Sequence, residues 1–106
     1  MWTVEYYSVK VQQAILSLPP TVLARYLQYV VTMLEEGANL GMPHTRAMGD
    51  GLFELRVKGK EGIARVFYCT QVGRRIIVLH SFVKKTQKTP IKELEIARKR
   101  MTEIRS

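Results

Sequence analysis

The chain has 106 residues, of which 46% are hydrophobic and 25% are charged. This length suits one domain with a genuine core and excludes two, and the longest apolar runs are too short to cross a bilayer. The first ten residues contain an acid and no apolar signal segment, so we expect a cytoplasmic protein. Cys69 is the single cysteine, which excludes an intrachain disulfide and agrees with a reducing compartment.

The formal net charge of +8 is distributed unevenly along the chain. Residues 1–50 hold three basic and four acidic residues, whereas residues 51–106 hold fourteen basic and five acidic ones. Such a field attracts polyanions and raises the rate at which the protein meets them. Nucleic acid is therefore the first partner to consider, and an acidic protein segment is the second. A solvated face that only keeps the protein soluble is the alternative without a function.

The N-terminal half predicts one strand followed by two helices. Residues 2–6 are rich in β-forming residues, and Ser8 offers an N-cap for a short helix over residues 9–17. Pro19 and Pro20 stop this helix, and a second one starts at Pro20 or Thr21 and ends at Gly37. Its apolar residues form one broad stripe, so the two helices predict a hairpin that covers one face of a sheet. Residues 38–50 show no periodicity and contain several turn formers, which predicts a loop.

Residues 51–83 predict three antiparallel strands joined by short turns at residues 60–62 and 72–74. The period-2 pattern places Phe53, Leu55 and Val57 on the opposite face from Glu54, Arg56 and Lys58. Arg65 lies opposite Ala64, Val66 and Tyr68. In the third strand the same pattern puts Ile76, Val78, His80 and Phe82 on one side. One face is thus apolar, and the other mixes apolar residues with Glu54, Arg56, Lys58, Arg65 and His80.

A basic loop, residues 84–89, follows the last strand and leads into a final helix. Thr89 is a suitable N-cap and Pro90 a suitable first helical residue. The apolar stripe of this helix consists of Ile91, Leu94, Ala97, Met101 and Ile104. The predicted fold class is therefore α+β, in the order β-α-α-β-β-β-α, with an antiparallel sheet, a helical hairpin on one face and a C-terminal helix. Residues 1–106 form one domain.

A basic sheet face with a few acids and one histidine contains the groups needed to cleave RNA. The 2′-hydroxyl of RNA is its own nucleophile, so the protein must orient it, move protons and stabilise charge on the phosphate. Arg56 and Arg65 are candidates to clamp the phosphate, Lys84 adds positive charge, and Glu54 or His80 is a candidate base. The sequence shows no phosphate-binding glycine loop and no zinc-ligand spacing, and it predicts no cofactor and no metal site.

Four segments carry a resemblance to a known family: GLFELRVKG at residues 51–59, ARVFY at 64–68, VLHSFVKKTQKTP at 78–90 and EIARKR at 95–100. Together with the order of elements, they make the chain similar to the RelE/ParE toxin superfamily, in particular to its HigB-like, phage-derived branch. The FELR and FVKKTQKTP strings are the most specific, and the N-terminal helices match only in pattern.

The resemblance implies a bacterial type II toxin, a metal-independent endoribonuclease that cuts mRNA during translation on the ribosome. It also implies a neutralising antitoxin with a helix-turn-helix DNA-binding domain. The toxin would then contact operator DNA only through this antitoxin. By position, Arg56 and Arg65 match the strand residues that contact phosphate in such toxins. The candidate catalytic residues are thus Arg56, Arg65, Glu54, Lys84 and His80, and the candidate RNA-binding residues are Lys58, Lys60, Arg74, Lys85 and Lys88. Many relatives also use a tyrosine near the C-terminus, and this chain has none after Tyr68, which leaves the general base unassigned.

Structural interpretations compete with these roles. In one interpretation, Arg65 and Glu54 form a purely structural pair across neighbouring strands. The functional interpretation instead predicts that removal of Arg65 abolishes toxicity with little loss of fold. In a second interpretation, His80 is a core histidine that forms a hydrogen bond with a backbone carbonyl. In a third, Lys84 and Lys85 are solvated and have no function. At the level of function, the alternatives are a ParE-like inhibitor of DNA gyrase and a non-catalytic RNA-binding module.

Overall fold

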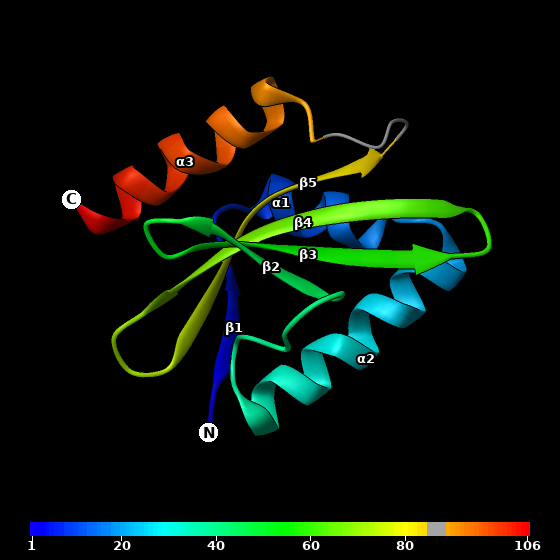
Figure 1. Ribbon diagram of the computed structural model, residues 1–106, viewed down its shortest axis with the longest axis horizontal. Coiled ribbons are helices and arrows are strands. Elements are labelled where there is room, and N and C mark those ends of the chain that lie inside the picture. The colour runs from blue at the N-terminus through cyan, green and yellow to red at the C-terminus, as the bar shows by residue number, and fades with distance from the viewer. Residues whose placement is uncertain (85–88) are drawn as a thin grey trace.

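The computed structural model describes residues 1–84 and 89–106 and contains five strands and three helices within them. Two helices follow the first strand, and the third helix ends the chain (Figure 1). The strands are β1 (Thr3–Tyr6), β2 (Thr45–Gly49), β3 (Leu52–Gly59), β4 (Gly62–Gln71) and β5 (Arg75–Lys84). The helices are α1 (Val9–Leu16), α2 (Pro20–Glu36) and α3 (Ile91–Arg105). No helix of the described ranges is both long enough and apolar enough to cross a membrane.

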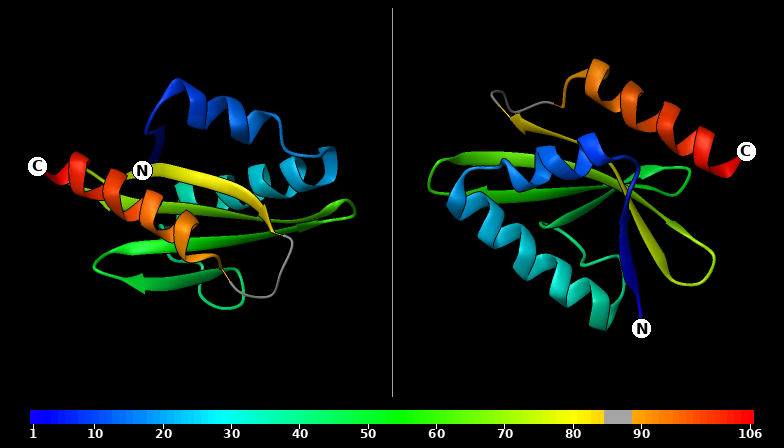
Figure 2. Two further views of the ribbon diagram at one scale, coloured as in Figure 1. Left: turned by 90° about the horizontal axis from the view of Figure 1, so that it is seen from above. Right: turned by 180° about the vertical axis from the view of Figure 1, so that it is seen from behind.

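The strands form one mixed sheet in the order β1-β5-β4-β3-β2. The antiparallel pairing of β3, β4 and β5 confirms the prediction, but β1 lies parallel to β5, with Thr3 beside Arg75 (Figure 2). The prediction of a loop throughout residues 38–50 is wrong for β2, which pairs with β3 and places Arg46 beside Glu54. The α+β class is confirmed, and the fold agrees with the RelE-like arrangement.

The sheet separates two apolar clusters. On one face, α1 and α2 pack on β3, β4 and β5, with Ile15, Tyr26, Leu55 and Val66 among the buried residues. On the other face, α3 covers only part of the sheet, where it buries Leu52, Phe67, Cys69, Leu79, Ala97 and Met101. The two helical layers lie on opposite sides of the strands in Figure 1. The α3 face beyond this second cluster is where the charged strand residues lie.

A β-bulge in β5 overturns the predicted alternation of that strand. Phe67 pairs with His80, whereas the next residue, Tyr68, pairs with Val78, so Leu79 is the extra residue. As a result, Val78 faces α1 and α2 while His80 lies on the face of α3, together with Leu79. The expectation that Val78 and His80 share a face is therefore wrong, because simple alternation assumes an uninterrupted ladder.

The helix ends follow the sequence signals at two of three places. Ser8 caps α1 by accepting a hydrogen bond from the backbone N–H of Val11, as predicted. Gly37, with a φ of 113°, ends α2. Thr89 does not cap α3, because its side chain donates to Glu54 instead, and the residue before the first turn is Pro90. Ile91 was predicted to belong to the apolar stripe of α3, but it is 73% exposed and lies outside that stripe.

The N-terminus of α2 lies directly against the end of β3. A Cβ atom at Gly59 would stand 2.6 Å from the backbone nitrogen of Val22 and 2.5 Å from the hydroxyl of Thr21. That hydroxyl accepts a hydrogen bond from the backbone N–H of Lys60. The carboxylate of Glu61 accepts from the backbone N–H of Thr21 at 3.2 Å, which satisfies a free donor of the first turn. Gly59 is thus required by close packing between the strand and the helix.

We predict that Gly59→Ala lowers the free energy of unfolding by about 1–3 kcal/mol, because the added methyl group forces the backbone of α2 away from β3. Urea denaturation followed by circular dichroism measures the change. An unchanged midpoint would contradict the close approach of Gly59 to Val22.

Candidate nucleic-acid interface

A buried ion pair lies at the centre of the charged face. The carboxylate of Glu54 on β3 is 1% exposed, and its Oε1 accepts a hydrogen bond of 2.6 Å from Nη1 of Arg65 on β4. The side chain of Arg65 is 11% exposed. The second carboxylate oxygen accepts a hydrogen bond of 2.7 Å from the hydroxyl of Thr89. Both oxygens of Glu54 are therefore occupied, and its charge holds Arg65 in one orientation at the surface.

Three more cations surround this pair. Arg56 is directly opposite Arg65 in the β3–β4 ladder, and Arg46 is directly opposite Glu54 in the β2–β3 ladder. Lys84, at the end of β5, is opposite Ile63, in the next row of the sheet. We call Arg46, Arg56, Arg65 and Lys84 the cation cluster. Glu54 is the carboxylate paired with it, so the cluster retains an excess of positive charge.

The surroundings of Lys84 act on the pKa of its ammonium group. Partial loss of hydration lowers its pKa below the usual value of 10.5, and repulsion from Arg65, Arg56 and Arg46 lowers it further. Glu54 acts in the opposite direction and raises the pKa, but it does not cancel these effects. Like charges held this close favour the binding of an anion.

The guanidinium groups of the cluster also have donors to spare. Within the described residues, Nε of Arg56 and Nε of Arg65 are buried and lack hydrogen-bond partners. Because these two nitrogens are enclosed, an anion would be bound through the terminal nitrogens of the guanidinium groups instead. A phosphodiester suits such a site, because it offers negative charge and several acceptors to two neighbouring arginines.

His80 lies at the contact between β5 and α3 and is separated from the cation cluster. Its Nε2 is 2.9 Å from a carboxylate oxygen of Glu93 on α3, and its Nδ1 is 3.5 Å from Nη1 of Arg100. Phe67 stands between His80 and Glu54 in the sheet, and its ring is stacked parallel to that of His80. A side-chain carboxylate, rather than the predicted backbone carbonyl, thus satisfies His80. This geometry supports a role in attaching α3 to the sheet.

The structure brings only some of the predicted RNA-binding residues together. Lys58 shares a face with Arg56, and Lys60 lies in the turn that follows. Arg74 lies in the turn at the opposite end of the sheet, where its carbonyl accepts from the N–H of Thr3. Lys85 and Lys88 lie outside the described residues.

Sequence reasoning missed two residues of this site. Arg46 was hidden because residues 45–49, TRAMG, lack the apolar alternation that marks a strand. Thr89 was assigned to a helix cap, and only its contact with Glu54 reveals the other role. The one signal in the sequence that pointed to Arg46 was its position as a basic residue shortly before the predicted β-hairpin.

The described residues contain no group of three or more histidine, cysteine or acidic side chains placed to hold a metal ion.

Comparison with known proteins provides the family. The model of the family described as phage-derived protein Gp49-like (DUF891) matches residues 13–102, from α1 to the last turns of α3. The chain belongs to this family. The Gp49-like family is of the RelE/HigB toxin type, in agreement with the fold. The matched range includes the whole cation cluster. No curated protein matches the chain.

We predict that Arg65→Ala lowers the free energy of unfolding by about 3 kcal/mol or more, because it leaves the buried Glu54 carboxylate without its counter-ion. The sequence alone predicted that Arg65→Ala would cause little loss of fold, and the buried ion pair replaces that expectation. Arg56→Ala, which removes an arginine without a carboxylate partner, is the matched control and should lower stability by less.

Urea denaturation of the single variants and of the double variant Glu54→Gln, Arg65→Gln measures the coupling. The double variant should be more stable than Arg65→Ala, because no uncompensated buried charge remains. Equal losses for Arg65→Ala and Arg56→Ala would contradict the importance of the pair.

Proposed function

We propose that this protein is the toxin of a bacterial type II toxin–antitoxin system, in the HigB-like branch, and that it cleaves mRNA on the translating ribosome. The observation that carries the proposal is the cation cluster, in which Glu54 orients Arg65 beside Arg56 and Lys84. The membership of the Gp49-like family supports the toxin assignment.

In the proposed reaction the 2′-hydroxyl of the substrate attacks the adjacent phosphate, and the 5′-oxygen of the next nucleotide leaves. Arg65 and Arg56 donate hydrogen bonds to the nonbridging oxygens, where negative charge develops. Lys84 adds positive charge at the same phosphate. Their main contribution is electrostatic stabilisation and orientation of the in-line geometry.

Glu54 serves as a positioning residue in this mechanism. The side chain of Glu54 is fully buried, and its oxygens accept hydrogen bonds from Arg65 and Thr89, which disfavours it as the acceptor of the 2′-hydroxyl proton. His80, tied to Glu93 across the α3 contact, also lies outside the cluster. The described residues of this face thus provide no assigned general base. We propose that water or a group of the substrate complex accepts the proton of the 2′-hydroxyl, and that the departing 5′-oxygen takes a proton from water.

The proposed partners follow from the same charges. A cognate antitoxin with a helix-turn-helix domain would neutralise the toxin through an acidic segment laid over the cation cluster, because complementary charge favours that contact. Operator DNA would be reached through the antitoxin.

We predict that Arg56→Gln reduces mRNA cleavage about 100-fold or more, because it removes charge and donors aimed at the transition state. Arg56 is preferred to Arg65 for this test because it has no carboxylate partner and its loss leaves Glu54 paired. The measurement is 5′-end mapping of a defined mRNA in a reconstituted translation reaction, with Lys10→Gln as the control for loss of one exposed positive charge.

New 5′ ends that require wild-type protein and ribosomes, and that disappear in Arg56→Gln, support the proposal. Cuts on naked mRNA would instead identify a free endoribonuclease. An absence of cuts by the wild-type protein in cells that still stop growing would contradict RNA cleavage and favour a protein target such as gyrase.

We predict that the cleavage rate falls as pH rises through the lowered pKa of Lys84, because deprotonation removes its positive charge. The sign follows from the direction of the shift: the lysine loses its proton below its ordinary value of 10.5. Lys84→Arg should retain activity and shift this alkaline limb upward, since arginine stays protonated. Single-turnover rates across pH on programmed ribosomes measure the effect, and identical alkaline limbs would contradict it.

A further inference from the structure

We propose that a groove between β3 and α2 binds the single-stranded RNA on one side of the cleavage point. This inference rests on the proposed function, because it concerns the path of the same substrate. The groove and the cation cluster lie on the two sides of the outer edge of β3. Most residues of the groove have no role in the mechanism above.

The groove exists because β2 is shorter than β3. The two strands pair only between Leu52 and Leu55, and the backbone N–H of Arg56 then donates to the carbonyl of His44 at 2.8 Å. Beyond this point the edge of β3 faces α2, and two adjoining hollows open between them. A hollow of about 220 Å³ is lined by Arg25, Tyr29, Pro43, His44, Arg56 and Lys58. A hollow of about 400 Å³ is lined by Thr21, Arg25, Lys58, Gly59 and Lys60. Arg25 and Lys58 line both, so the hollows adjoin, and we call the two together the groove.

Among the described residues, the lining of the groove holds four basic residues and no carboxylate, and the carboxylate of Glu61, which accepts from Thr21, borders its far end. Arg25, on α2, and Lys58, on β3, line both hollows, so an anion bound there would lie near positive charge from two elements. The exposed side chains of Arg25, Lys58 and Lys60 remain accessible to solvent. Such a track suits a chain of phosphates, whose regular spacing of charge engages successive cations.

One wall of the groove is aromatic. The ring centroids of Tyr29 and His44 are 5.0 Å apart, and their planes are inclined by 44°. Tyr29 packs partly on the core, which holds its ring in place, whereas His44 is exposed. Planar side chains beside a basic track are the combination that binds single-stranded nucleic acid, because bases stack on the rings while the phosphates contact the cations. This aromatic wall favours RNA over an acidic peptide, which offers no bases to stack.

Arg56 connects the groove with the cation cluster. It stands opposite Arg65 in the β3–β4 ladder and also lines the smaller hollow. A strand whose phosphate is held by Arg65 therefore reaches the groove by passing Arg56. From Arg56 to Gly59 the track follows β3 for about 10 Å, at about 3.3 Å per residue, and Lys60 lies in the turn that follows. The groove thus extends the contact with substrate by a few nucleotides beyond the cleaved bond.

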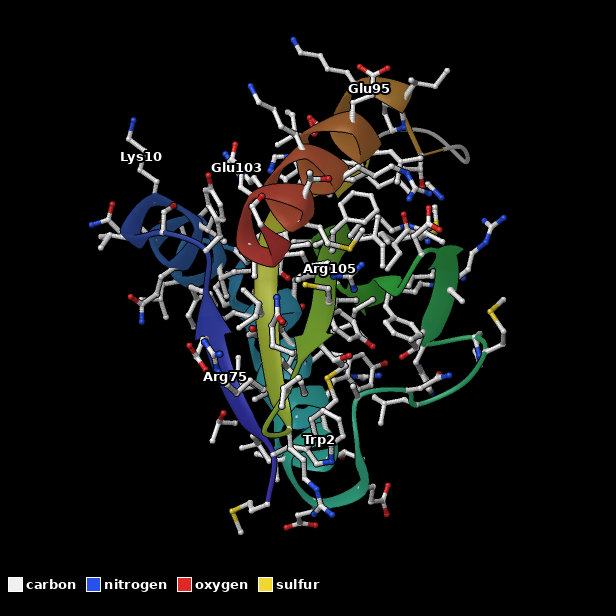
Figure 3. The ribbon with its side chains drawn as sticks, turned by 90° about the vertical axis from the view of Figure 1, so that its left-hand side faces the viewer. Trp2, Lys10, Arg75, Glu95, Glu103 and Arg105 are labelled. Carbon is white, nitrogen blue, oxygen red and sulfur yellow. The ribbon has the colours of Figure 1, made fainter. Side chains whose placement is uncertain are left out.

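The kinetic test uses Arg25→Gln and His44→Ala, with Lys10→Gln as the control. Lys10 extends from α1 away from the rest of the molecule (Figure 3) and its loss removes the same charge. In the reconstituted cleavage reaction, each groove variant should raise KM for mRNA-programmed ribosomes about tenfold and leave kcat unchanged, because the contact is uniform binding. An unchanged KM in both groove variants, with melting temperatures equal to that of the wild type, would overturn the groove.

A photo-cross-linking test identifies the occupant. Gln28 is exposed on α2 one turn after Arg25, and Gln12 is exposed on α1. Each is replaced in turn by p-benzoylphenylalanine, and programmed ribosomes carry an mRNA with a 2′-deoxy nucleotide at the mapped cut, which lacks the nucleophile. We expect the Gln28 probe, and not the Gln12 probe, to cross-link mRNA within a few nucleotides of the cut.

The remaining outcomes separate the two proposals. Cross-links from the Gln28 probe only to ribosomal RNA, ribosomal protein or the antitoxin, while the wild-type protein still cuts mRNA, would overturn the groove and leave the proposed function intact. An absence of cuts by the wild-type protein would overturn the proposed function, and the assignment of the groove with it.

Discussion

The structure depends on how one buried negative charge is satisfied. Glu54 lies inside the sheet face with both carboxylate oxygens occupied, one by Arg65 on the neighbouring strand and the other by Thr89 just before α3. Three parts of the chain that are distant in sequence therefore meet at one carboxylate. Desolvation of this charge is costly without such partners, so the same contacts that stabilise the fold also set the direction of Arg65. Stability and a cationic surface are coupled here through a single residue.

Partial coverage of the sheet leaves the cations around this buried carboxylate near the surface of a small domain. The α1–α2 hairpin buries an apolar face, whereas α3 closes only the part of the other face around Leu52, Phe67 and Leu79. The uncovered remainder holds the cation cluster on four strands, β2 to β5, where the ladder fixes the spacing between side chains. Cations on a rigid sheet lose little conformational freedom when they bind an anion. His80, with Glu93 and Arg100, stands at the boundary between the covered and uncovered parts.

The sequence predicted the parts of the fold in which local pattern and tertiary structure agree. The alternation of β3 and β4 correctly separated Leu55 and Val57 from Glu54 and Arg56, and the pairing of Glu54 with Arg65 was among the alternatives considered. Prediction failed where the decisive cause is non-local. TRAMG becomes β2 because β3 offers it an edge, the bulge at Leu79 interrupts a pattern that assumes a regular ladder, and Thr89 bonds to a carboxylate thirty-five residues away. The hollows beside α2 likewise depend on where β2 stops.

The parallel pairing of β1 with β5 has a consequence for the order in which the chain folds. Thr3 lies beside Arg75, which is labelled in Figure 3, and the carboxylate of Glu5 accepts from Arg75 at 2.5 Å and 2.8 Å. Because β1 has no other strand beside it, it has to wait for the synthesis of β5, about seventy residues later. Such contacts close a long loop and slow folding. Thr89, which completes the site at Glu54, follows later still. A nascent chain therefore lacks the complete set of contacts around Glu54, which orients Arg65, until Thr89 has been made.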